Sequence, residues 1–280
     1  MKILIYAFLI FKIDTVAIVF TSDILSQFGE GKATFINPNF PPPLGGALSF
    51  ESFLKEERSK YKNLLLFDTG NLTGGYIALE NPNIDEVVFF CKKMKYNAIC
   101  PGVREFIGGV DKFKCYLDKG LTFISSNIIG IEGVLKYKIF EKNGIKIGVF
   151  GLTTQYMPLY SLPWNVSGLK IIDEIETAKK MVKILKDKGV DIIICLSNIS
   201  YDREKILARE VEGIDVILGG FEGYGLREPY IDYYTHTILL RVYDNFSNVG
   251  EILLFYDTDS KVLTGFKYYS ITLFSEQFPY

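Results

Sequence analysis

Unbroken apolar runs that end in polar turns predict the strands of a buried sheet in this chain. The run Leu64–Phe67 shows no alternation of apolar and polar residues, so we expect a strand covered on both faces. Similar runs span Val16–Phe20, Asp191–Leu196 and Ile214–Leu218, and each leads into a polar or glycine-rich turn. Ligands of α/β proteins gather beyond the carboxyl ends of such strands, so the residues after these four runs are candidates for one shared site.

Between these strands, helical spacing of apolar residues predicts a set of amphipathic helices. The strongest pattern covers Ile172–Lys188, and Gly189 is placed to end that helix. Other helices are expected at Ala47–Tyr61, Asp85–Met94, Asp111–Lys119 and Asp202–Glu210.

The remaining pattern predicts further strands and turns. Asn143-Gly144 lies between the runs Tyr137–Phe140 and Lys146–Phe150, which indicates a hairpin, and three successive prolines make Gly29–Gly46 a loop. Helices that alternate with strands, followed by a strand-rich end, favour a mixed α/β domain. More strands are expected at Ala98–Cys100, Leu121–Ser125, Ile238–Val242, Gly250–Tyr256 and Phe266–Ile271.

Composition places the chain among globular proteins with a large core. It has 280 residues, 48% of them hydrophobic, and a net charge of −2, so we expect one domain over residues 1–280 and no nucleic-acid footprint. The apolar run Ile3–Phe11 is too short for a transmembrane helix. Residues 1–14 therefore form either a signal or anchor segment or an edge strand, which leaves cytoplasmic and exported or periplasmic locations equally open.

The cysteines and the single histidine suggest no separate catalytic centre. None of the four cysteines forms a Cys-x-x-Cys pair, so we expect them to be reduced. His236 reads as a turn or strand residue, and no motif supports pairing it with Cys195 or Ser197 as a nucleophile. Aromatic residues on two loops form either a binding rim or the cover of a closed cleft: Tyr156, Tyr160, Trp164, Tyr224, Tyr230, Tyr233 and Tyr234.

Five stretches in this order resemble the N-terminal domain of the 5′-nucleotidases, a group of calcineurin-like metallophosphoesterases. The resemblance runs from about Val16 to about Asp257 and implies a four-layer α/β/β/α sandwich of two mixed sheets flanked by helices. It also implies that the C-terminal nucleotidase domain is not part of this chain. The stretches are Pro43–Gly46, Leu65–Gly70, Ile124–Ile128, Asn143–Thr154 and Gly213–Gly220.

That family hydrolyses phosphoesters with two divalent metals such as manganese, zinc or iron, held by carboxylates, imidazoles and an asparagine. Asp23 matches the first family ligand. At the other motif positions the family has His, Asp, Asn, a catalytic His, His and a closing His-x-His. This chain has Leu25, Asn71, Val103, Arg104, Asn198, Phe221 and Gly223 there.

The sequence therefore predicts a family scaffold with a degenerate metal site, in effect a pseudoenzyme, and no cofactor. We expect Arg104 to replace the lost positive charge and to pair with Asp23, Glu105 or Glu222. The leading function is binding of an unknown protein partner or a small anion in the former cleft. The alternative is a weak or altered phosphoester hydrolase with one metal at Asp23 and Asn71, or none. Candidate binding residues are Asp23, Asn71, Arg104, Glu105, Asn198 and Glu222.

Overall fold

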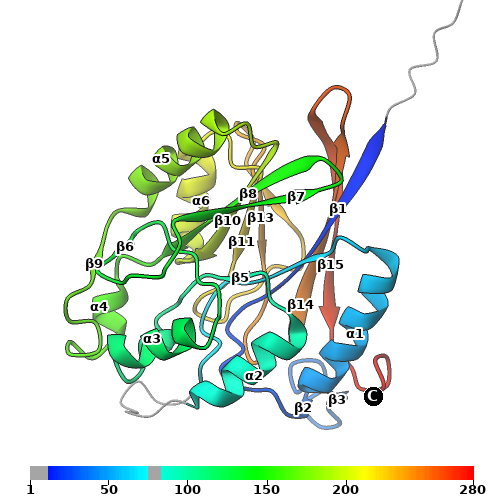
Figure 1. Cartoon of the computed structure of the whole chain (residues 1–280). Helices are drawn as coiled ribbons and strands as arrows, with labels where there is room; N and C mark the ends of the chain where they lie inside the picture. The colour runs from blue at the N-terminus through cyan, green and yellow to red at the C-terminus, as the bar shows by residue number, and fades with distance from the viewer. Residues whose placement is uncertain (1–11, 75–82) are drawn as a thin grey trace, which may run out of the picture.

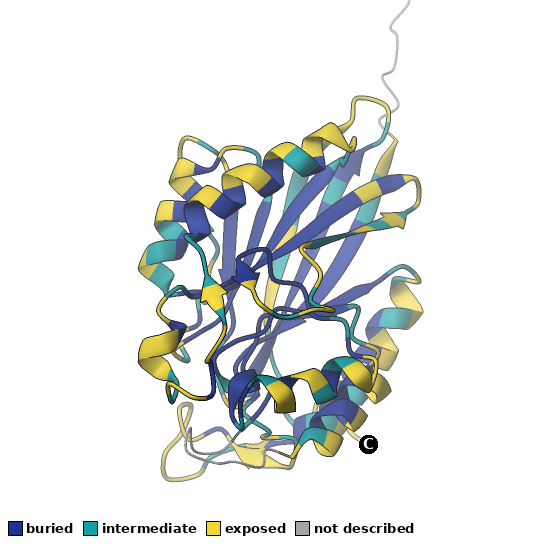
Figure 2. Cartoon of the chain, turned by 60° about the vertical axis from the view of Figure 1, so that its left-hand side comes forward, coloured by how far each residue is buried: buried dark blue, intermediate teal, exposed yellow. Residues whose placement is uncertain are grey.

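Two mixed sheets face each other in the computed structural model, with helices over both outer faces (Figure 1). The structure describes residues 12–74 and 83–280. Apolar side chains fill the space between the sheets, including Ile18, Phe67 and Ile194. Figure 2 shows buried strands in the centre and helices whose outer faces are exposed. The predicted α/β/β/α architecture is thus confirmed.

The first sheet is built around β1, which pairs in parallel with β4 and antiparallel with β14. The apolar run at Leu65–Asp68 is buried along its whole length, as the lack of alternation predicted. In the described residues this sheet has the order β15 (Val262–Thr272), β14 (Asn248–Asp257), β1 (Ile13–Thr21), β4 (Leu65–Asp68) and β5 (Ala98–Ile99).

The second sheet has a parallel centre made of β8, β10, β11 and β13. Asn143-Gly144 forms the turn between β7 and β8, as the sequence predicted. The order of the described strands is β12 (Tyr230–Ile231), β13 (Ile238–Arg241), β11 (Val216–Gly219), β10 (Ile192–Asn198), β8 (Ile145–Thr153) and β7 (Tyr137–Lys142).

Helices α1 and α2 cover the outer face of the first sheet, and α5 and α6 cover that of the second. Gly189 has a φ of +68° directly after α5, which confirms its place as the helix stop. The helices are α1 (Gly46–Lys60), α2 (Ile84–Met94), α3 (Val110–Asp118), α4 (Met157–Tyr160), α5 (Glu174–Asp187) and α6 (Tyr201–Glu210), with a 3-10 turn η1 (Arg104–Phe106).

Some expectations need correction. Leu121–Ser125 forms isolated bridges through Phe123 and Ile124 rather than a strand, because its neighbours offer only single pairing positions. The loop Gly29–Gly46 contains a short ladder, and another short pair was not predicted. These pairs are β2 (Gly31–Lys32) with β3 (Pro43–Leu44), and β6 (Ile128–Ile129) with β9 (Lys170–Ile171).

The prediction for residues 1–14 is only partly open to comparison. Residues 1–11 lie outside the described residues, and Ile13 already belongs to β1. Across the described ranges, no helix combines the length and the apolar character that crossing a membrane requires.

Two carboxyl groups meet where α1 packs on β14. Glu57 and Glu251 are both buried, and Lys60 lies 2.7 Å from the Glu57 carboxylate. Burial, with a hydrogen bond to Glu57 and its negative charge, raises the pKa of Glu251 to about 8, while Lys60 opposes the shift. Burial beside Glu57 therefore favours the protonated form of Glu251 in the folded protein.

The stability that Glu251 contributes is expected to decline toward alkaline pH. Its folded pKa lies above the ~4.3 of an unfolded glutamate, so this contribution is full below that value and is lost as pH rises through about 8. In urea denaturation, Glu251→Gln should lose less unfolding free energy than the parent between about pH 6 and about pH 9. Parallel profiles for the two proteins would contradict a protonated Glu251.

Candidate functional site

The carboxyl ends of strands from both sheets meet at one place. Asp23 follows β1, Asn71 follows β4 and Asn198 ends β10. Asn198 Nδ2 donates to the carbonyl of Thr69 at 2.8 Å, and the Asp23 N–H donates to the carbonyl of Gly70 at 2.9 Å. The structure thus brings together the residues that the sequence placed at separate strand ends.

Asp23 and Asn71 are bonded directly to each other. Asn71 Nδ2 donates to Asp23 Oδ1 at 2.7 Å, and the Gly223 N–H donates to Asp23 Oδ2 at 3.1 Å. The Arg104 N–H donates to Asn71 Oδ1 at 2.9 Å. Burial raises the pKa of Asp23. The hydrogen bonds from Asn71 and Gly223 and the charge of Arg241 act against that rise. Both carboxylate oxygens are therefore already used by protein donors.

A cation that the sequence did not single out acts on Asp23. Arg241, on β13, is the positive charge that lowers the pKa of Asp23. The expected pairing of Arg104 with Asp23, Glu105 or Glu222 stays a prediction. Arg104 takes part in the site through its backbone N–H, because it lies in the η1 turn beside Asn71.

Glu105 is fully buried and holds two loops together. Its carboxylate accepts the backbone N–H groups of Asn71 at 2.9 Å, Thr73 at 3.2 Å and Gly102 at 2.7 Å. Burial raises the pKa of Glu105, and the hydrogen bonds from these N–H groups oppose the rise. The carboxylate thus joins the turn after β4 to the turn before η1.

A second buried carboxyl group, Asp68, lies at the end of β4. It accepts the Thr21 hydroxyl at 2.6 Å and the Gly70 N–H at 2.7 Å. Burial raises the pKa of Asp68 well above its usual range, and the charges of Glu105 and Asp23 add to the rise. Several acidic groups therefore share the base of the site.

A buried ion pair supports the loop after β11. Arg241 and Glu204 are both fully buried and form an ion pair, and the Ser197 hydroxyl donates to Glu204 at 2.7 Å. Arg241 also donates to the carbonyls of Phe221 at 2.5 Å and Tyr224 at 2.7 Å. Burial raises the pKa of Glu204, and the charge of Arg241 opposes it. The pair fixes the segment that presents the Gly223 N–H to Asp23.

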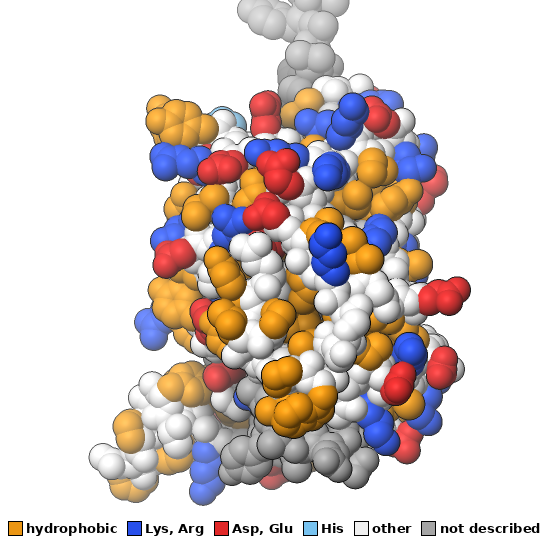
Figure 3. Space-filling model, turned by 90° about the vertical axis from the view of Figure 1, so that its left-hand side faces the viewer, with side chains coloured by type: hydrophobic (Ala, Val, Ile, Leu, Met, Phe, Trp, Pro, Cys, Tyr) orange, Lys and Arg blue, Asp and Glu red, His pale blue; other side chains and the backbone are white. Residues whose placement is uncertain are grey.

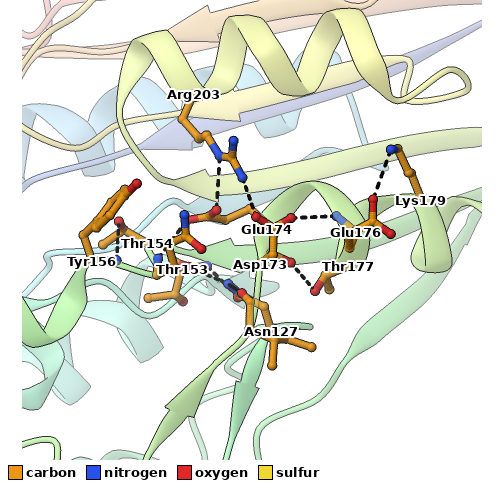
Figure 4. Close-up of polar contacts among 12 residues, drawn as sticks. Asn127, Thr153, Thr154, Tyr156, Asp173, Glu174, Glu176, Thr177, Lys179 and Arg203 are labelled. Atoms are coloured by element: carbon orange, nitrogen blue, oxygen red, sulfur yellow. Dashed lines mark hydrogen bonds and ion pairs between the residues drawn. The ribbon is translucent and has the colours of Figure 1, made fainter.

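Another network, drawn in Figure 4, fixes the end of β8. Asn127 donates to the Thr153 carbonyl at 2.6 Å and accepts the Thr153 N–H at 2.9 Å. Arg203 on α6 reaches Asp173 at 2.6 Å and Glu174 at 3.2 Å at the start of α5. Asp173 also caps α5 by accepting the Glu176 N–H at 2.9 Å.

Sequence reasoning missed Arg241, Glu204 and Arg203 as supports of the site. The sequence does carry one signal, a basic residue that ends the apolar run Ile238–Leu240. A charged residue inside a buried strand needs a buried partner. Its partner Glu204 lies 37 positions away, so the pair itself was not visible.

Backbone strain gathers in the loops around the site. Non-glycine residues there adopt φ angles from +46° to +143°, a region that costs about 1–3 kcal/mol per residue. Such strain persists only where the surroundings enforce it. The strained residues are Asp23, Leu25, Ser26, Asn71, Phe221, Glu222, Asn245 and Phe246.

Ser197, Cys195 and His236, for which the sequence offered no catalytic motif, do not form a catalytic group in the structure. Ser197 donates to Glu204, and Cys195 is buried in β10, where burial raises the pKa of its thiol well above the usual range. His236 is exposed in the turn between β12 and β13. In contrast, an aromatic group borders the site, since the Tyr160 ring packs against Phe221 and its hydroxyl lies 3.4 Å from Glu222.

Two divalent metals would not fit the residues present. They require several anionic oxygens or imidazoles. At the matched ligand positions only Asp23 is a carboxylate, and it is already bonded to two N–H groups. The other positions include the neutral Asn71 and Asn198 and the apolar Val103 and Phe221. Within residues 12–74 and 83–280, no cluster of three or more His, Cys, Asp or Glu side chains could hold a metal ion.

Comparisons with known proteins relate the chain to nucleotidases. Snake venom 5′-nucleotidase from Naja atra is 31% identical over 188 residues, which are 63% of this chain and 35% of that protein. Human 5′-nucleotidase is 29% identical over 216 residues, 72% of this chain and 37% of that protein. The chain thus spans about a third of the length of these curated relatives. No family model matches the sequence.

The fold agrees with a solved structure in the same group. A 5′-nucleotidase precursor from Thermus thermophilus superposes with a TM-score of 0.84 at 21% identity. The superposition covers 95% of this chain and 56% of that one. The resemblance to the N-terminal part of 5′-nucleotidases is therefore confirmed in sequence, and the metallophosphoesterase fold in structure.

Proposed function

We infer that this chain, a relative of the 5′-nucleotidases with the metallophosphoesterase fold, is a non-catalytic homologue whose former metal site is closed by hydrogen bonds. One observation carries this proposal. Asp23 matches the family's first metal ligand, and its two carboxylate oxygens accept hydrogen bonds from the N–H groups of Asn71 and Gly223. The N–H groups of Asn71 and Gly223 thus satisfy the carboxylate without a metal ion.

A protein partner suits the site better than a small anion. Asp23, Asp68 and Glu105 are buried at its base, and an anion there would add to the unfavourable negative charge that already raises the pKa of Asp68. Exposed apolar side chains stand on the α4 segment nearby, and hydrophobic side chains gather on the face drawn in Figure 3. Exposed apolar groups of this kind favour contact with another protein. The exposed residues include Tyr156, Leu159 and Trp164.

Metal binding and hydrolysis give a direct test. Calorimetric titration with manganese or zinc should give no saturable heat. Turnover of a generic phosphodiester such as bis(p-nitrophenyl) phosphate in manganese should equal that of the Asp23→Ala variant. Tight metal binding, with turnover that Asp23→Ala abolishes, would overturn the proposal.

The Asn71→Asp variant supplies a matched positive control. It replaces the amide donor by a second carboxylate 2.7 Å from Asp23, which should cost about 1–3 kcal/mol. A bound cation would offset this repulsion, so manganese should raise the Tm of Asn71→Asp and leave that of the parent unchanged. An equal rise in both proteins would contradict a site closed by Asn71.

One observation favours the second candidate, a weak hydrolase with a single metal or none. Asn198 Oδ1 is buried and accepts no hydrogen bond from the described residues. It lies beside the Gly102 backbone, where an added Cβ would collide with the amides of both Asn198 and Asn71. An acceptor left open in this way would suit one weakly bound cation, and the same titration decides between the candidates.

A further inference from the structure

A large cavity lies outside the closed site. It has a volume of about 1420 Å³ and runs between the second half of β15, Tyr268–Thr272, and the loop residues Phe35 and Ile36. We call it the β15 groove. Pockets for small molecules usually span about 300–1,000 Å³, so this one suits a larger occupant. It adjoins the site, since the N–H of its lining residue Asn245 donates to the carbonyl of Asp23 at 2.9 Å.

One wall of the β15 groove is an unpaired strand edge. Among the described strands, β15 pairs only with β14 and stands at the margin of its sheet (Figure 1). An edge strand of 11 residues presents a row of backbone N–H and C=O groups to any chain that can pair with them.

The two halves of this edge differ in the features that prevent it from pairing with another strand. The ladder to the first half shifts register between Phe255 and Tyr256, and Lys267 follows on β15. Bulges and lysines are the usual devices that keep edge strands from pairing. Tyr268–Thr272, the half that lines the groove, contains no charged residue and no proline. Only this half keeps the features of a strand that can accept a partner.

The opposite wall is apolar and uncovered. Phe35 and Ile36 are 63% and 51% exposed in the chain. A peptide laid along Tyr268–Thr272 would place alternate side chains on each of its faces, and those on one face could cover both residues. Backbone pairing and apolar contact would then come from opposite sides of one groove.

The charges of the groove also select its occupant. Lys32 and Arg227 line it together with Glu228 and Asp244, and no ion pair joins these four side chains among the described residues. Two cations and two anions leave the groove without net charge. Such a surface gives no attraction to a polyanion and is complementary to a segment of balanced charge.

We propose that the β15 groove binds an extended segment of a partner protein, apolar and without net charge, which adds to Tyr268–Thr272 as a further strand. The proposal rests on the proposed function only in that it says where a protein partner docks. If hydrolysis were found, the proposal about the β15 groove would still stand. If no peptide bound the groove, the result of the metal titration would be unaffected.

The probe is a phage-displayed library of random heptapeptides, selected on the immobilised full chain. Selected peptides should be rich in β-branched and aromatic residues, free of proline, and near neutral. In hydrogen exchange, a synthesised peptide should protect the backbone amides of Tyr268–Thr272. The double variant Phe35→Ser, Ile36→Ser should weaken its Kd about tenfold or more.

Phe40→Ser is the matched control, because Phe40 is on the same loop and 82% exposed but does not line the groove. It should leave the peptide Kd unchanged. A library that yields no binder, or binders that protect amides around Asp23 and not β15, would overturn the proposal. So would light scattering that reports a dimer whose β15 amides are protected without peptide, because a second copy would then fill the groove.

Discussion

Replacing Arg241 with methionine is expected to lower the free energy of unfolding by about 3–5 kcal/mol. The substitution keeps most of the side-chain volume but leaves the Glu204 carboxylate buried without its cation. It also removes the donors to the carbonyls of Phe221 and Tyr224, and the buried Phe221 carbonyl then has fewer partners. Urea denaturation at neutral pH, followed by circular dichroism, measures the loss.

Two further variants separate the ion pair from general damage. The exposed Arg209, on α6, serves as the control, and Arg209→Met should change stability by less than about 0.5 kcal/mol. The double variant Arg241→Met, Glu204→Leu removes both charges and should recover part of the loss. If Arg241→Met costs no more than Arg209→Met, the buried pair does not support the loop after β11.

Glu105→Ala is expected to cost at least about 3 kcal/mol, because three backbone N–H groups lose one shared acceptor. The N–H groups belong to Asn71, Thr73 and Gly102, which lie in the two turns that this carboxylate joins. The turns should loosen before the rest of the fold opens. Hydrogen exchange measures this directly, as faster exchange at these three amides than at amides in β4.

Glu105→Gln is the conservative comparison for this experiment. It retains one acceptor oxygen and the side-chain shape, so it should fall between the parent and Glu105→Ala in stability. The nearby Glu222 is exposed, so Glu222→Gln should have the stability of the parent. Unchanged exchange at Asn71 and Gly102 in Glu105→Ala would mean that these amides have another acceptor or are not constrained by Glu105.

The sequence predicted the sheets well because buried parallel strands have a local signature. Runs such as Leu64–Phe67 and Asp191–Leu196 are almost wholly apolar, and each became a central strand. Leu121–Ser125 carries a similar run yet forms only isolated bridges. Whether a short apolar run finds a partner along its whole length depends on chain segments far away, which local patterns do not report.

The site was predictable in its members but not in its bonding. Motif order placed Asp23, Asn71 and Asn198 at neighbouring strand ends, and they do converge. The pairing expected of Arg104 stays a prediction, and Arg241, which the sequence did not single out, acts on Asp23. Direction of a side chain follows from packing and backbone angles, such as the φ of +61° at Asn71, and sequence spacing does not encode it.

The pairing of β1 with β14 means that the first sheet cannot be completed until both strands have been made. Ile13 to Phe20 pair with Asp257 to Gly250, so β1 needs a neighbour that is made more than 200 residues later. A nascent chain would carry β1 with one edge unpaired until β14 has been made. Contacts between residues so far apart in sequence slow folding. Until β14 pairs with it, β1 can bind a chaperone or pair with a wrong strand.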